Sequence, residues 1–425
     1  MQRSSPSNVA TGRDTYPIHA PSIAARMTRS LLRRIGDPAI ALVLWTGETV
    51  TTGRREPIGQ LIVANPRTLA RLFFDPEMEF GEAYSDGRIH VRGDLTRIME
   101  EVNRCEAASA ISPALRAPIR SARAVYRYSS RSRARDNIYH HYDISNDFYS
   151  MWLGRTMAYT CAYYPAAEAT LDEAQIAKMD HVCRKLRLRP GERVIEAGCG
   201  WGSLAIHMAC RYGVKVTALN ISREQLGFAR KRAKAEGLGE QVDFIESDYR
   251  DIDQAEGSYD AFVSVGMLEH VNLHDYVDLG RRVSKCLNAA GRGLIHSIGR
   301  NRPARLHAWI EKRIFPGASA PAIGEMMRIF ESADHSILDV ENLRPHYART
   351  LRDWRERFNG HIEAVREQFD ERFVRMWELY LCGSEAAFHT GDLQIFQILF
   401  APRASSFAPW TRADLYAPAD QHAHL

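Results

Sequence analysis

Residues 194–202, Val-Ile-Glu-Ala-Gly-Cys-Gly-Trp-Gly, decide the fold class of this 425-residue chain. A β-branched strand end leads to an acidic residue, three glycines follow, and the apolar run 203–209 is compatible with a helix. Glycines at a strand-to-helix turn allow positive φ and let a ligand lie against bare backbone. The helix that follows offers free N–H groups at its N-terminus. The stretch therefore predicts a nucleotide-binding turn.

The glycine spacing indicates which nucleotide is bound. A dinucleotide site needs G-x-G-x-x-G, whereas Gly198, Gly200 and Gly202 are spaced G-x-G-x-G. Glu196 stands two positions before the first glycine, where a carboxylate suits a cationic ligand better than a pyrophosphate. This pattern is typical of S-adenosylmethionine (SAM) methyltransferases, with Glu196 placed to bind the amino group of the methionine moiety.

Strands and helices alternate around this turn. We expect a helix over 171–188, the strand before the glycines, strand 215–219, helix 222–237 capped by Ser222, strands 242–245 and 261–265, helix 276–287 and strand 293–297. The repetition predicts an α/β fold, a doubly wound and mainly parallel sheet of the Rossmann-like class I SAM-methyltransferase type. The ligand should lie at the carboxyl ends of the strands, at 196–202, 220–221, 248–249, 266–269 and 296–298.

The segments on either side predict further parts. Residues 1–30 are expected to be disordered, 31–106 to form a smaller N-terminal α/β domain for docking or dimerisation, 107–136 to be an Arg-rich linker, 137–402 to form the catalytic domain with an acyl-chain pocket, and 403–425 to be a C-terminal tail. Within the N-terminal domain we expect strands 40–45, 60–63 and 88–91, helix 68–74, and a turn over 81–87.

The remaining expected elements belong to the catalytic domain. They are helix 148–153 capped by Asn146 and Asp147, a buried strand over 157–164, helices 309–315, 350–369 and 371–390, and strand 393–400 as the antiparallel edge of the sheet.

Composition limits the class of protein. The net charge is +4, and the seven cysteines form no CxxC and no Cys/His spacing typical of a metal site, so no metal is predicted. Free thiols favour a reducing cytoplasm. The N-terminus has no secretory h-region, and no apolar run near it is long enough to span a bilayer. We therefore expect a cytoplasmic, soluble or peripheral protein.

The Arg-rich linker is the strongest charge feature. Between residues 107 and 135 there are seven arginines and no acidic residue, with Tyr126 and Tyr128 interleaved. Such a segment is attracted to anionic phosphate, on a lipid surface or on nucleic acid, or is simply a solvated linker. We favour an anionic membrane surface and expect no nucleic acid, because no nucleic-acid-binding module accompanies the charge.

Nine stretches in order carry a resemblance to a known family. They are HHYDISNDFYSMWL (140–153), MAYTCAYY (157–164), VIEAGCGWGSLA (194–205), SDYRDI (247–252), SVGMLEHV (264–271), GLIHSIG (293–299), WIEKRIFPG (309–317), ENLRPHYARTLRDWRERF (341–358) and GSEAAFHTGDLQIFQILF (383–400). Over residues 137–402 the chain resembles the cyclopropane-fatty-acyl-phospholipid synthases, including the mycolic acid cyclopropane synthases. The extended N-terminal region makes it more similar to the phospholipid-acting branch.

The resemblance implies two bound groups. SAM would contact Tyr159, Thr160, Glu196, Gly198, Cys199, Gly200, Trp201, Gly202, Asn220, Gln225, Tyr249 and Arg250. A bicarbonate ion beside the methyl group would act as the base, held by Cys161, Glu269, His296, the backbone of Ile298, and Tyr347. Taken singly, these side chains also suit a buried thiol, a helix-start charge, a core histidine and a packing aromatic.

The implied reaction explains why a base and a dry pocket are needed beside the methyl group. A cis alkene is a poor nucleophile, so the methyl must be held close and in line. Attack gives a carbocation, and loss of a proton from the new methyl closes the ring. Water would quench the cation, so a dry aromatic pocket is required. Its candidate residues, which core packing also explains, are Tyr142, Phe148, Tyr163, Tyr164, Trp309 and Phe315.

Two positions depart from the family pattern. Asn220 stands where family members often have threonine, which alters the expected ribose contact. Residues 317–320, Gly-Ala-Ser-Ala, replace the usual glycine-glycine-aromatic-leucine beside the acyl site and leave chain-length and headgroup preference open.

Four functions remain in competition. The favoured one is cyclopropane formation on unsaturated phospholipid acyl chains at a membrane surface, with a homodimer as the candidate assembly. The second is a C-methyltransferase that makes methyl- or methylene-branched chains, because the same base serves both. The third, a small-molecule N-methyltransferase, needs no carbonate base. A nucleic-acid-binding protein is the fourth.

Overall fold

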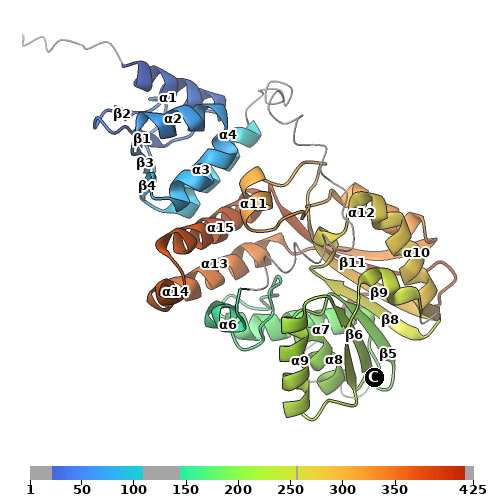
Figure 1. Cartoon of the computed structure of the whole chain (residues 1–425). Coiled ribbons are helices and arrows are strands. Elements are labelled where there is room, and N and C mark those ends of the chain that lie inside the picture. Colours follow the sequence, from blue (N-terminus) through green and yellow to red (C-terminus); the bar gives the residue numbers. More distant parts are fainter. Residues whose placement is uncertain (1–21, 109–143, 255–256, 417–425) are drawn as a thin grey trace, which may run out of the picture.

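The computed structural model describes residues 22–108, 144–254 and 257–416, which form two parts, each with its own sheet (Figure 1). The Arg-rich stretch 109–135 and Tyr142 lie outside the described residues. In the described part of the chain, no helix is both long and apolar enough to cross a membrane. Nor is any group of three or more His, Cys, Asp and Glu side chains there arranged to hold a metal ion.

The larger part contains a seven-stranded sheet in the order β10-β11-β9-β8-β5-β6-β7. Neighbours from β9 to β7 pair in parallel, while β11 is antiparallel to both β9 and β10. The strands are β5 (Arg193–Ala197), β6 (Lys215–Asn220), β7 (Val242–Glu246), β8 (Tyr259–Val265), β9 (Leu287–Gly299), β10 (His335–Asn342) and β11 (Gln394–Pro402). This is the predicted doubly wound α/β sheet.

Helices cover both faces of this sheet because its strands are apolar on both sides. Val194 packs into one core with helices α7 (Leu171–Leu186), α8 (Ser203–Tyr212) and α9 (Arg223–Ala235). The next residue, Ile195, faces the opposite core, with α10 (Tyr276–Cys286) and α12 (Ile323–Glu331). Ser222 caps α9 as predicted, by accepting a hydrogen bond from the Gln225 N–H.

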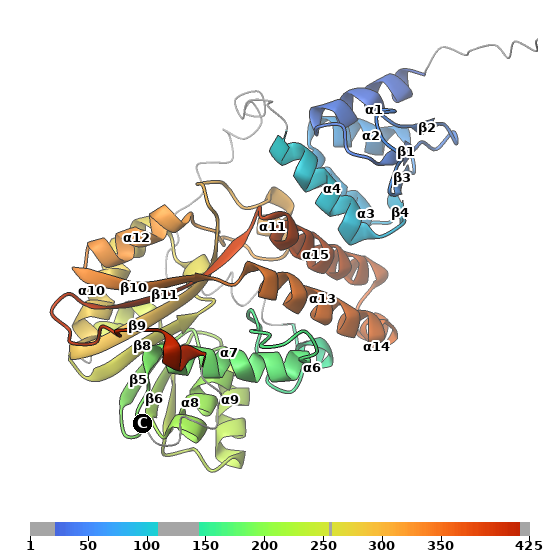
Figure 2. The same cartoon turned by 180° about the vertical axis from the view of Figure 1, so that it is seen from behind.

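A helical layer lies beside the carboxyl ends of the strands (Figure 2). It contains α6 (Asn146–Leu153), α11 (Ala308–Arg313), α13 (Arg344–Gly360), α14 (Ile362–Gln368) and α15 (Glu371–Thr390). The helix predicted over 350–369 is therefore wrong in its bounds, because it begins at Arg344 and is interrupted at His361. The cap of α6 is also corrected, since Ser145 accepts from the Phe148 N–H in place of Asn146 or Asp147.

The position of β11 corrects the expectation of an edge strand. It lies between β9 and β10, and β10, which was not predicted, is the edge. The residues of β11 from Gln394 to Ala401 are all buried. A strand that is buried on both faces is typical of a sheet interior. The nearly continuous apolar sequence of β11 therefore indicated an interior strand.

The smaller part has a four-stranded sheet in the order β2-β1-β3-β4. The strands are β1 (Ala41–Val43), β2 (Thr49–Val50), β3 (Gln60–Val63) and β4 (Ile89–Arg92), and the helices are α1 (Ile23–Arg34), α2 (Pro66–Phe74), α3 (Pro76–Ser85) and α4 (Leu95–Ala108). Residues 23–30, expected to be disordered, begin α1, because Ser22 caps the helix and its apolar face packs on the sheet.

The turn predicted over 81–87 is wrong for most of its length, since residues 76–85 form α3. Pro76 and the N-cap Asp75 start this helix, and Asp75 accepts from the Met78 N–H at 3.3 Å. Gly81 is required for packing, because a Cβ there would collide with the ring of Trp309 on α11. Gly81 therefore serves close packing against a residue that is distant in the sequence, although a glycine at this position is also typical of a turn.

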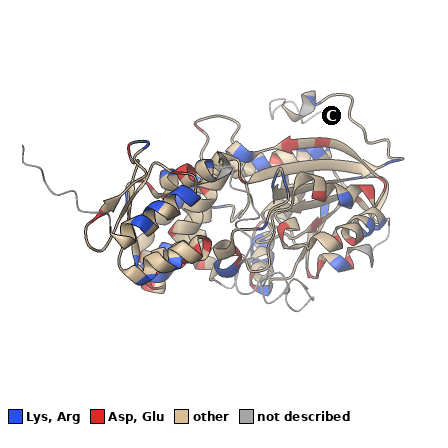
Figure 3. Ribbon diagram, turned by 90° about the horizontal axis from the view of Figure 1, so that it is seen from above, with Lys and Arg blue, Asp and Glu red and all other residues tan. Residues whose placement is uncertain are grey.

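Helix α15 joins the two parts by packing against α3 and α4 (Figure 1). Arg375 donates to the carbonyl oxygens of Tyr84 at 2.6 Å and Ile89 at 2.9 Å, and its guanidinium lies over the Tyr84 ring. The Tyr84 hydroxyl donates to Glu378 at 2.7 Å. Basic and acidic positions both occur on each part (Figure 3), in keeping with the small net charge.

The C-terminal tail is ordered in its described portion, residues 403–416. Leu415 is buried, and Arg412 forms an ion pair with Asp339 of β10. Arg187 also donates to the Thr411 carbonyl at 3.4 Å. This segment therefore packs against α7 and the edge of the sheet.

Replacement of Arg292 tests what fixes the start of β9. Arg292 is 4% exposed, binds Glu192 with two nitrogens at 2.6 and 2.9 Å, and donates to the carbonyls of Leu186, Arg187 and Asp260. Because Arg292→Met leaves these acceptors without a donor, we expect the free energy of unfolding in urea to fall by about 3–5 kcal/mol. Arg403→Met, at an exposed pair with Asp334, is the control and should barely change it. Equal effects would contradict the assignment.

Candidate active site

The glycine turn adopts the backbone conformation that its sequence requires. Gly198, Gly200 and Gly202 have φ values of 84°, 54° and 78°. A Cβ at Gly202 would lie 2.7 Å from the ring of Phe244 and 2.8 Å from the Cβ of Ala229. The third glycine is therefore needed for helix packing, while the first two bring bare backbone to a cavity.

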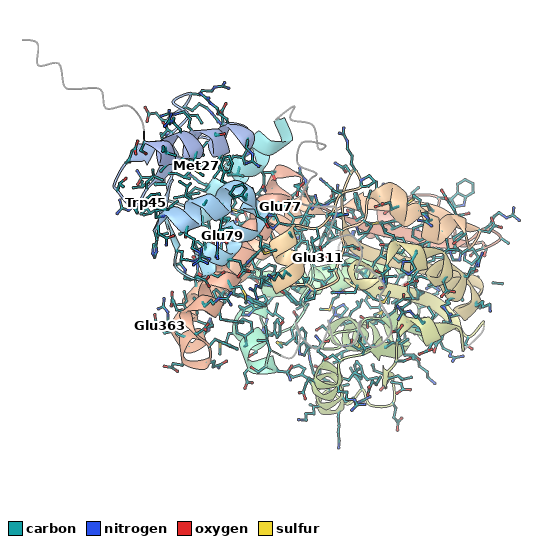
Figure 4. The ribbon with its side chains drawn as sticks, turned by 45° about the horizontal axis from the view of Figure 1, so that its top comes forward. Met27, Trp45, Glu77, Glu79, Glu311 and Glu363 are labelled. Carbon is teal, nitrogen blue, oxygen red and sulfur yellow. The ribbon has the colours of Figure 1, made fainter. Side chains whose placement is uncertain are left out.

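That cavity, here called cavity 1, has a volume of about 390 Å³ and lies at the carboxyl ends of β5, β6 and β8. Except for Gly202, which lies behind the turn, every residue predicted to contact SAM lines it. These are Tyr159, Thr160, Glu196, Gly198, Cys199, Gly200, Trp201, Asn220, Gln225, Tyr249 and Arg250. Glu311 of α11, labelled in Figure 4, also lines cavity 1, so this helix extends from the N-terminal part to the site.

Glu196 places a buried carboxyl group on the wall of cavity 1. It is 2% exposed, and its Oε2 has no hydrogen-bond partner among the described residues. Burial raises the pKa of Glu196 to about 8, and the nearby ammonium of Lys178 partly opposes that rise. A carboxylate in this state gains most from a cationic ligand, which restores both its charge and its hydrogen bond.

Asn220 is held in place by its own surroundings. Its amide nitrogen donates to the Gly200 carbonyl at 3.2 Å and to the Gln225 Oε1 at 2.8 Å, and its Oδ1 accepts from the Ile221 N–H at 2.9 Å. The side chain thus connects the glycine turn to the end of β6. This departure from the family pattern stabilises the turn locally.

Other residues of cavity 1 are fixed by second contacts. The Trp201 indole N–H donates to the Asn146 Oδ1 at 2.7 Å. The Arg250 guanidinium lies 4.8 Å from the centre of the Tyr249 ring and pairs with Asp248 at 3.0 Å. These contacts position the aromatic and charged side chains that line cavity 1.

A second cavity, cavity 2, adjoins the first and has a volume of about 110 Å³. Tyr159, Thr160, Gly266 and His270 line both cavities. All the residues predicted to hold bicarbonate line cavity 2: Cys161, Glu269, His296, Ile298 and Tyr347. The topology thus brings together side chains from four separate parts of the chain.

Glu269 has one satisfied oxygen and one unsatisfied oxygen. Its Oε1 accepts from the Ile298 N–H at 2.6 Å, so the backbone group assigned to bicarbonate by resemblance donates to Glu269 here. Its Oε2 has no partner among the described residues. Burial raises the pKa of Glu269 to about 7, against the lowering effect of the Ile298 hydrogen bond.

His296 is buried and oriented by the neighbouring strand. Gln397 lies directly opposite it in the β9–β11 register, and the Gln397 amide Nε2 donates to His296 Nδ1 at 3.0 Å. Burial holds the pKa of His296 well below its usual range, so the ring is neutral. Because Nδ1 accepts, the proton lies on Nε2, which is buried and has no partner among the described residues.

Cys161 and Tyr347 complete the polar side of cavity 2. Burial raises the pKa of the Cys161 thiol, which stays protonated and donates to the Ala162 carbonyl at 3.2 Å. The Tyr347 ring, on α13, packs 4.6 Å from the ring of Phe388 on α15. Neither side chain is positioned as an activated nucleophile.

Residues 157–164 do not form the predicted strand, because they run along an irregular path with no neighbouring strand. Side chains satisfy their backbone groups instead. Gln175 donates to the carbonyls of Ala158 and Thr160, and the N–H groups of Ala162 and Tyr164 donate to Thr350 and His346 respectively. The segment therefore runs from cavity 1 to cavity 2 as a loop whose backbone groups are hydrogen-bonded to side chains of neighbouring helices.

The aromatic residues predicted for a dry pocket are distributed more widely than expected. Only Phe315 lines cavity 2. Of the others that are described, Phe148 and Trp309 pack in the core, Tyr163 stacks between His181 and His346, and Tyr164 donates to Asp353. The aromatic wall instead includes Tyr159, Tyr380 and Phe388, with the Tyr159 and Tyr380 hydroxyls 2.8 Å apart.

Several site residues were missed by the sequence reasoning. Lys178 and Gln175 belong to the helix 171–188, whose apolar spacing was noted while its buried polar positions were not. Gln397 lies in the strand predicted over 393–400, in which no site residue was predicted. His270 lies inside the quoted stretch 264–271, and burial lowers its pKa to about 4. Polar residues at core positions of otherwise apolar elements were the available signal.

The chain matches the model of the mycolic acid cyclopropane synthetase family over residues 129–398, and a domain family of unknown function over 27–112. It is 35% identical to a probable fatty acid methyltransferase of Pseudomonas putida, over 89% of this chain and 96% of that one. It is 34% identical to the cyclopropane-fatty-acyl-phospholipid synthase of Escherichia coli K12, over 80% and 87% respectively. The structure is similar to a mycolic acid cyclopropane synthase complexed with SAH and CTAB, with a TM-score of 0.59, 27% identity, and coverage of 63% of this chain and 97% of that one.

Replacement of Gln397 tests the orientation of His296. In Gln397→Leu, the imidazole loses the donor that fixes its tautomer, so the ¹⁵N resonances of His296 should shift towards a mixture of tautomers. We expect turnover to fall about 2- to 10-fold, since one neutral hydrogen bond is lost. Gln394→Leu, on the same strand but bonded to Asn342 and Gly391, should leave the His296 resonances unchanged. Unchanged resonances in Gln397→Leu would contradict the assigned tautomer.

Proposed function

Because this chain belongs to the mycolic acid cyclopropane synthetase family, we propose that it transfers a methylene group from SAM to the cis double bond of an unsaturated phospholipid acyl chain, forming a cyclopropane ring. At the coarser level it is a SAM-dependent methyltransferase of lipid acyl chains with a class I fold. The observation that carries the finer proposal is a pair of buried polar atoms on the wall of cavity 2, Glu269 Oε2 and His296 Nε2, which have no hydrogen-bond partner in the described part of the chain.

SAM suits cavity 1 in both charge and shape. The positive-φ glycines leave space beside the backbone, and Glu196 presents a buried, unsatisfied carboxylate oxygen. When bound, SAM supplies an electrophilic methyl group on a sulfonium. Tyr159 and Thr160 line both cavities, so these residues would separate the cofactor from the acyl chain while leaving the methyl accessible.

Bicarbonate suits the polar side of cavity 2. The ion has one O–H group and further acceptor oxygens, and the wall offers a matching acceptor at Glu269 and donor at His296. When bound, it would supply a base close to the transferred methyl. Glu269 would accept its proton in a hydrogen bond, and His296 and Tyr347 would orient it.

The reaction balances in two steps. The π electrons of the alkene form a bond to the methyl carbon as the carbon–sulfur bond breaks, which releases S-adenosylhomocysteine and leaves a positive charge on the other alkene carbon. Transfer of a proton from the new methyl to the bound bicarbonate would then leave the electron pair that closes the ring. The apolar wall of cavity 2, including Phe315 and Phe388, would keep water from the cation.

A branched product is the second candidate, and similarity to the fatty acid methyltransferase favours it specifically. A 1,2-hydride shift before deprotonation moves the positive charge to the carbon that carries the new methyl. Loss of a proton from that methyl then gives a methylene branch. Small-molecule N-methylation is less well supported, because an amine substrate would leave Glu269 and His296 without a role.

The membrane setting is also part of the proposal. A phospholipid substrate implies that the enzyme acts peripherally, on the cytoplasmic side of an anionic bilayer. The Arg-rich stretch 109–135, outside the described residues, would contribute attraction to such a surface. A homodimer remains a prediction, and no nucleic-acid partner is proposed.

A lipid assay tests the proposed reaction. Purified protein, methyl-labelled SAM and bicarbonate are incubated with vesicles of cis-unsaturated anionic phospholipids, and the released acyl chains are analysed by mass spectrometry and proton NMR. We expect a gain of one CH₂ with upfield ring protons. Glu269→Gln should reduce the rate about 10²- to 10⁴-fold and leave SAM affinity unchanged. Vinyl or branched-methyl signals would instead support the second candidate, and no labelled lipid would refute both.

The pH dependence tests the role of Glu269 separately. At saturating SAM and constant bicarbonate concentration, the rate should rise between pH 6 and 8 with a midpoint near 7. Because Oε1 accepts from the Ile298 N–H, protonation of Glu269 would place the proton on Oε2 and turn this acceptor into a donor, and burial raises the pKa of Glu269 to about 7. His296 stays neutral throughout this range and contributes no inflection. Glu269→Gln should flatten the profile, and a persistent inflection near 7 in that variant would assign it to another group.

A further inference from the structure

Two buried lysines on α7 differ in the partners of their ammonium groups. Lys185 is 1% exposed and pairs with Asp339 at 3.1 Å and Glu341 at 2.6 Å. Lys178, two turns earlier and 2% exposed, donates to the neutral Thr160 hydroxyl at 2.7 Å. It has no carboxylate within 4.0 Å among the described residues. A buried ammonium without an adjacent anion is unfavourable, so this position indicates a missing anionic partner.

Lys178 lines cavity 1 and does not line cavity 2. On the wall of the same cavity, Glu196 has a buried oxygen that no described residue hydrogen-bonds. Burial lowers the pKa of Lys178 to about 8, and the nearby Glu196 charge opposes the shift. Lys178 and Glu196 are therefore two ionisable groups on the wall of cavity 1 that have no oppositely charged group in contact among the described residues, whereas Arg250 pairs with Asp248 there.

The matching ligand carries a cation and an anion close together. An α-amino acid group has this arrangement, and the methionine end of SAM is such a group. We propose that Lys178 binds the carboxylate of the methionine moiety of SAM, while Glu196 binds its amino group. This assignment rests on the proposed cofactor, and it adds a residue that the glycine-turn pattern does not specify.

The alternative anion is the base in the adjoining cavity. Thr160, the hydrogen-bond acceptor of Lys178, lines both cavities, so the ammonium is not remote from cavity 2. However, the groups with unsatisfied hydrogen-bonding capacity in cavity 2 already include both an acceptor, on Glu269, and a donor, on His296. Carbonate therefore has partners without Lys178, whereas the methionine carboxylate requires a donor from the wall of cavity 1.

The experiment compares SAM with decarboxylated SAM, which lacks only the carboxylate. Both dissociation constants are measured by calorimetry for the full chain and for Lys178→Met. We expect the variant to bind SAM about 10- to 100-fold more weakly, as expected for loss of a hydrogen bond to a charged group. Its affinity for decarboxylated SAM should change less than about threefold. Lys178→Arg, which retains the charge, should recover part of the SAM affinity.

Lys185→Met is the matched control, because it removes an equally buried lysine from the same helix that pairs with carboxylates outside cavity 1. It should lower the urea midpoint without selective loss of SAM. Equal weakening of both ligands by Lys178→Met would overturn the proposal and indicate a structural role. Unchanged SAM affinity with an altered bicarbonate dependence of turnover would also overturn it. Failure of the unaltered protein to bind SAM would refute the proposed function itself.

Discussion

The site depends on the loop 157–164, which has to cross the ends of the parallel strands without a strand of its own to pair with. Its buried N–H and carbonyl groups need partners, and Gln175, Thr350 and His346 supply them from two helices. The loop is the shared wall between cavity 1 and cavity 2. Its fixed path brings Tyr159, Thr160 and Cys161 to the boundary where methyl transfer would occur.

Local signals predicted the fold well. The glycines of 198–202 and the Ser222 cap each depend on nearby residues, and the βα alternation defined the sheet. Predictions failed where a distant residue decides the structure. Gly81 suggested a turn, although it is required because Trp309 packs against it. The loop 157–164 is as apolar and aromatic as a buried strand but has no neighbour in the sheet. The resemblance to the family pointed to His296 and Glu269. Gln397, which donates to His296, and Lys178 were recognised only from the structure, because their contacts are with residues that are distant in the sequence.

Burial explains why the two cavities are poised for different ligands. In each cavity, burial of an ionisable group away from water shifts its pKa. The pKa is raised for Glu196 and Glu269 and lowered for Lys178 and His296. Water would relax these groups only partly, whereas ligands of matching charge would satisfy them. The protein thus enters the reaction with its dipoles already oriented, so little reorganisation is needed at the moment when charge develops.

The interior position of β11 also determines when the larger sheet can be completed during synthesis of the chain. Strands β9 and β10 leave the ribosome before β11, so the growing chain contains both flanking strands with their facing edges unpaired. Only when residues 394–402 insert between them does the sheet close and Gln397 reach His296. The nascent chain can therefore complete the surroundings of His296 only after β11 has been synthesised, and a prematurely terminated chain would lack the Gln397 contact and expose strand edges that would attract chaperones or proteases.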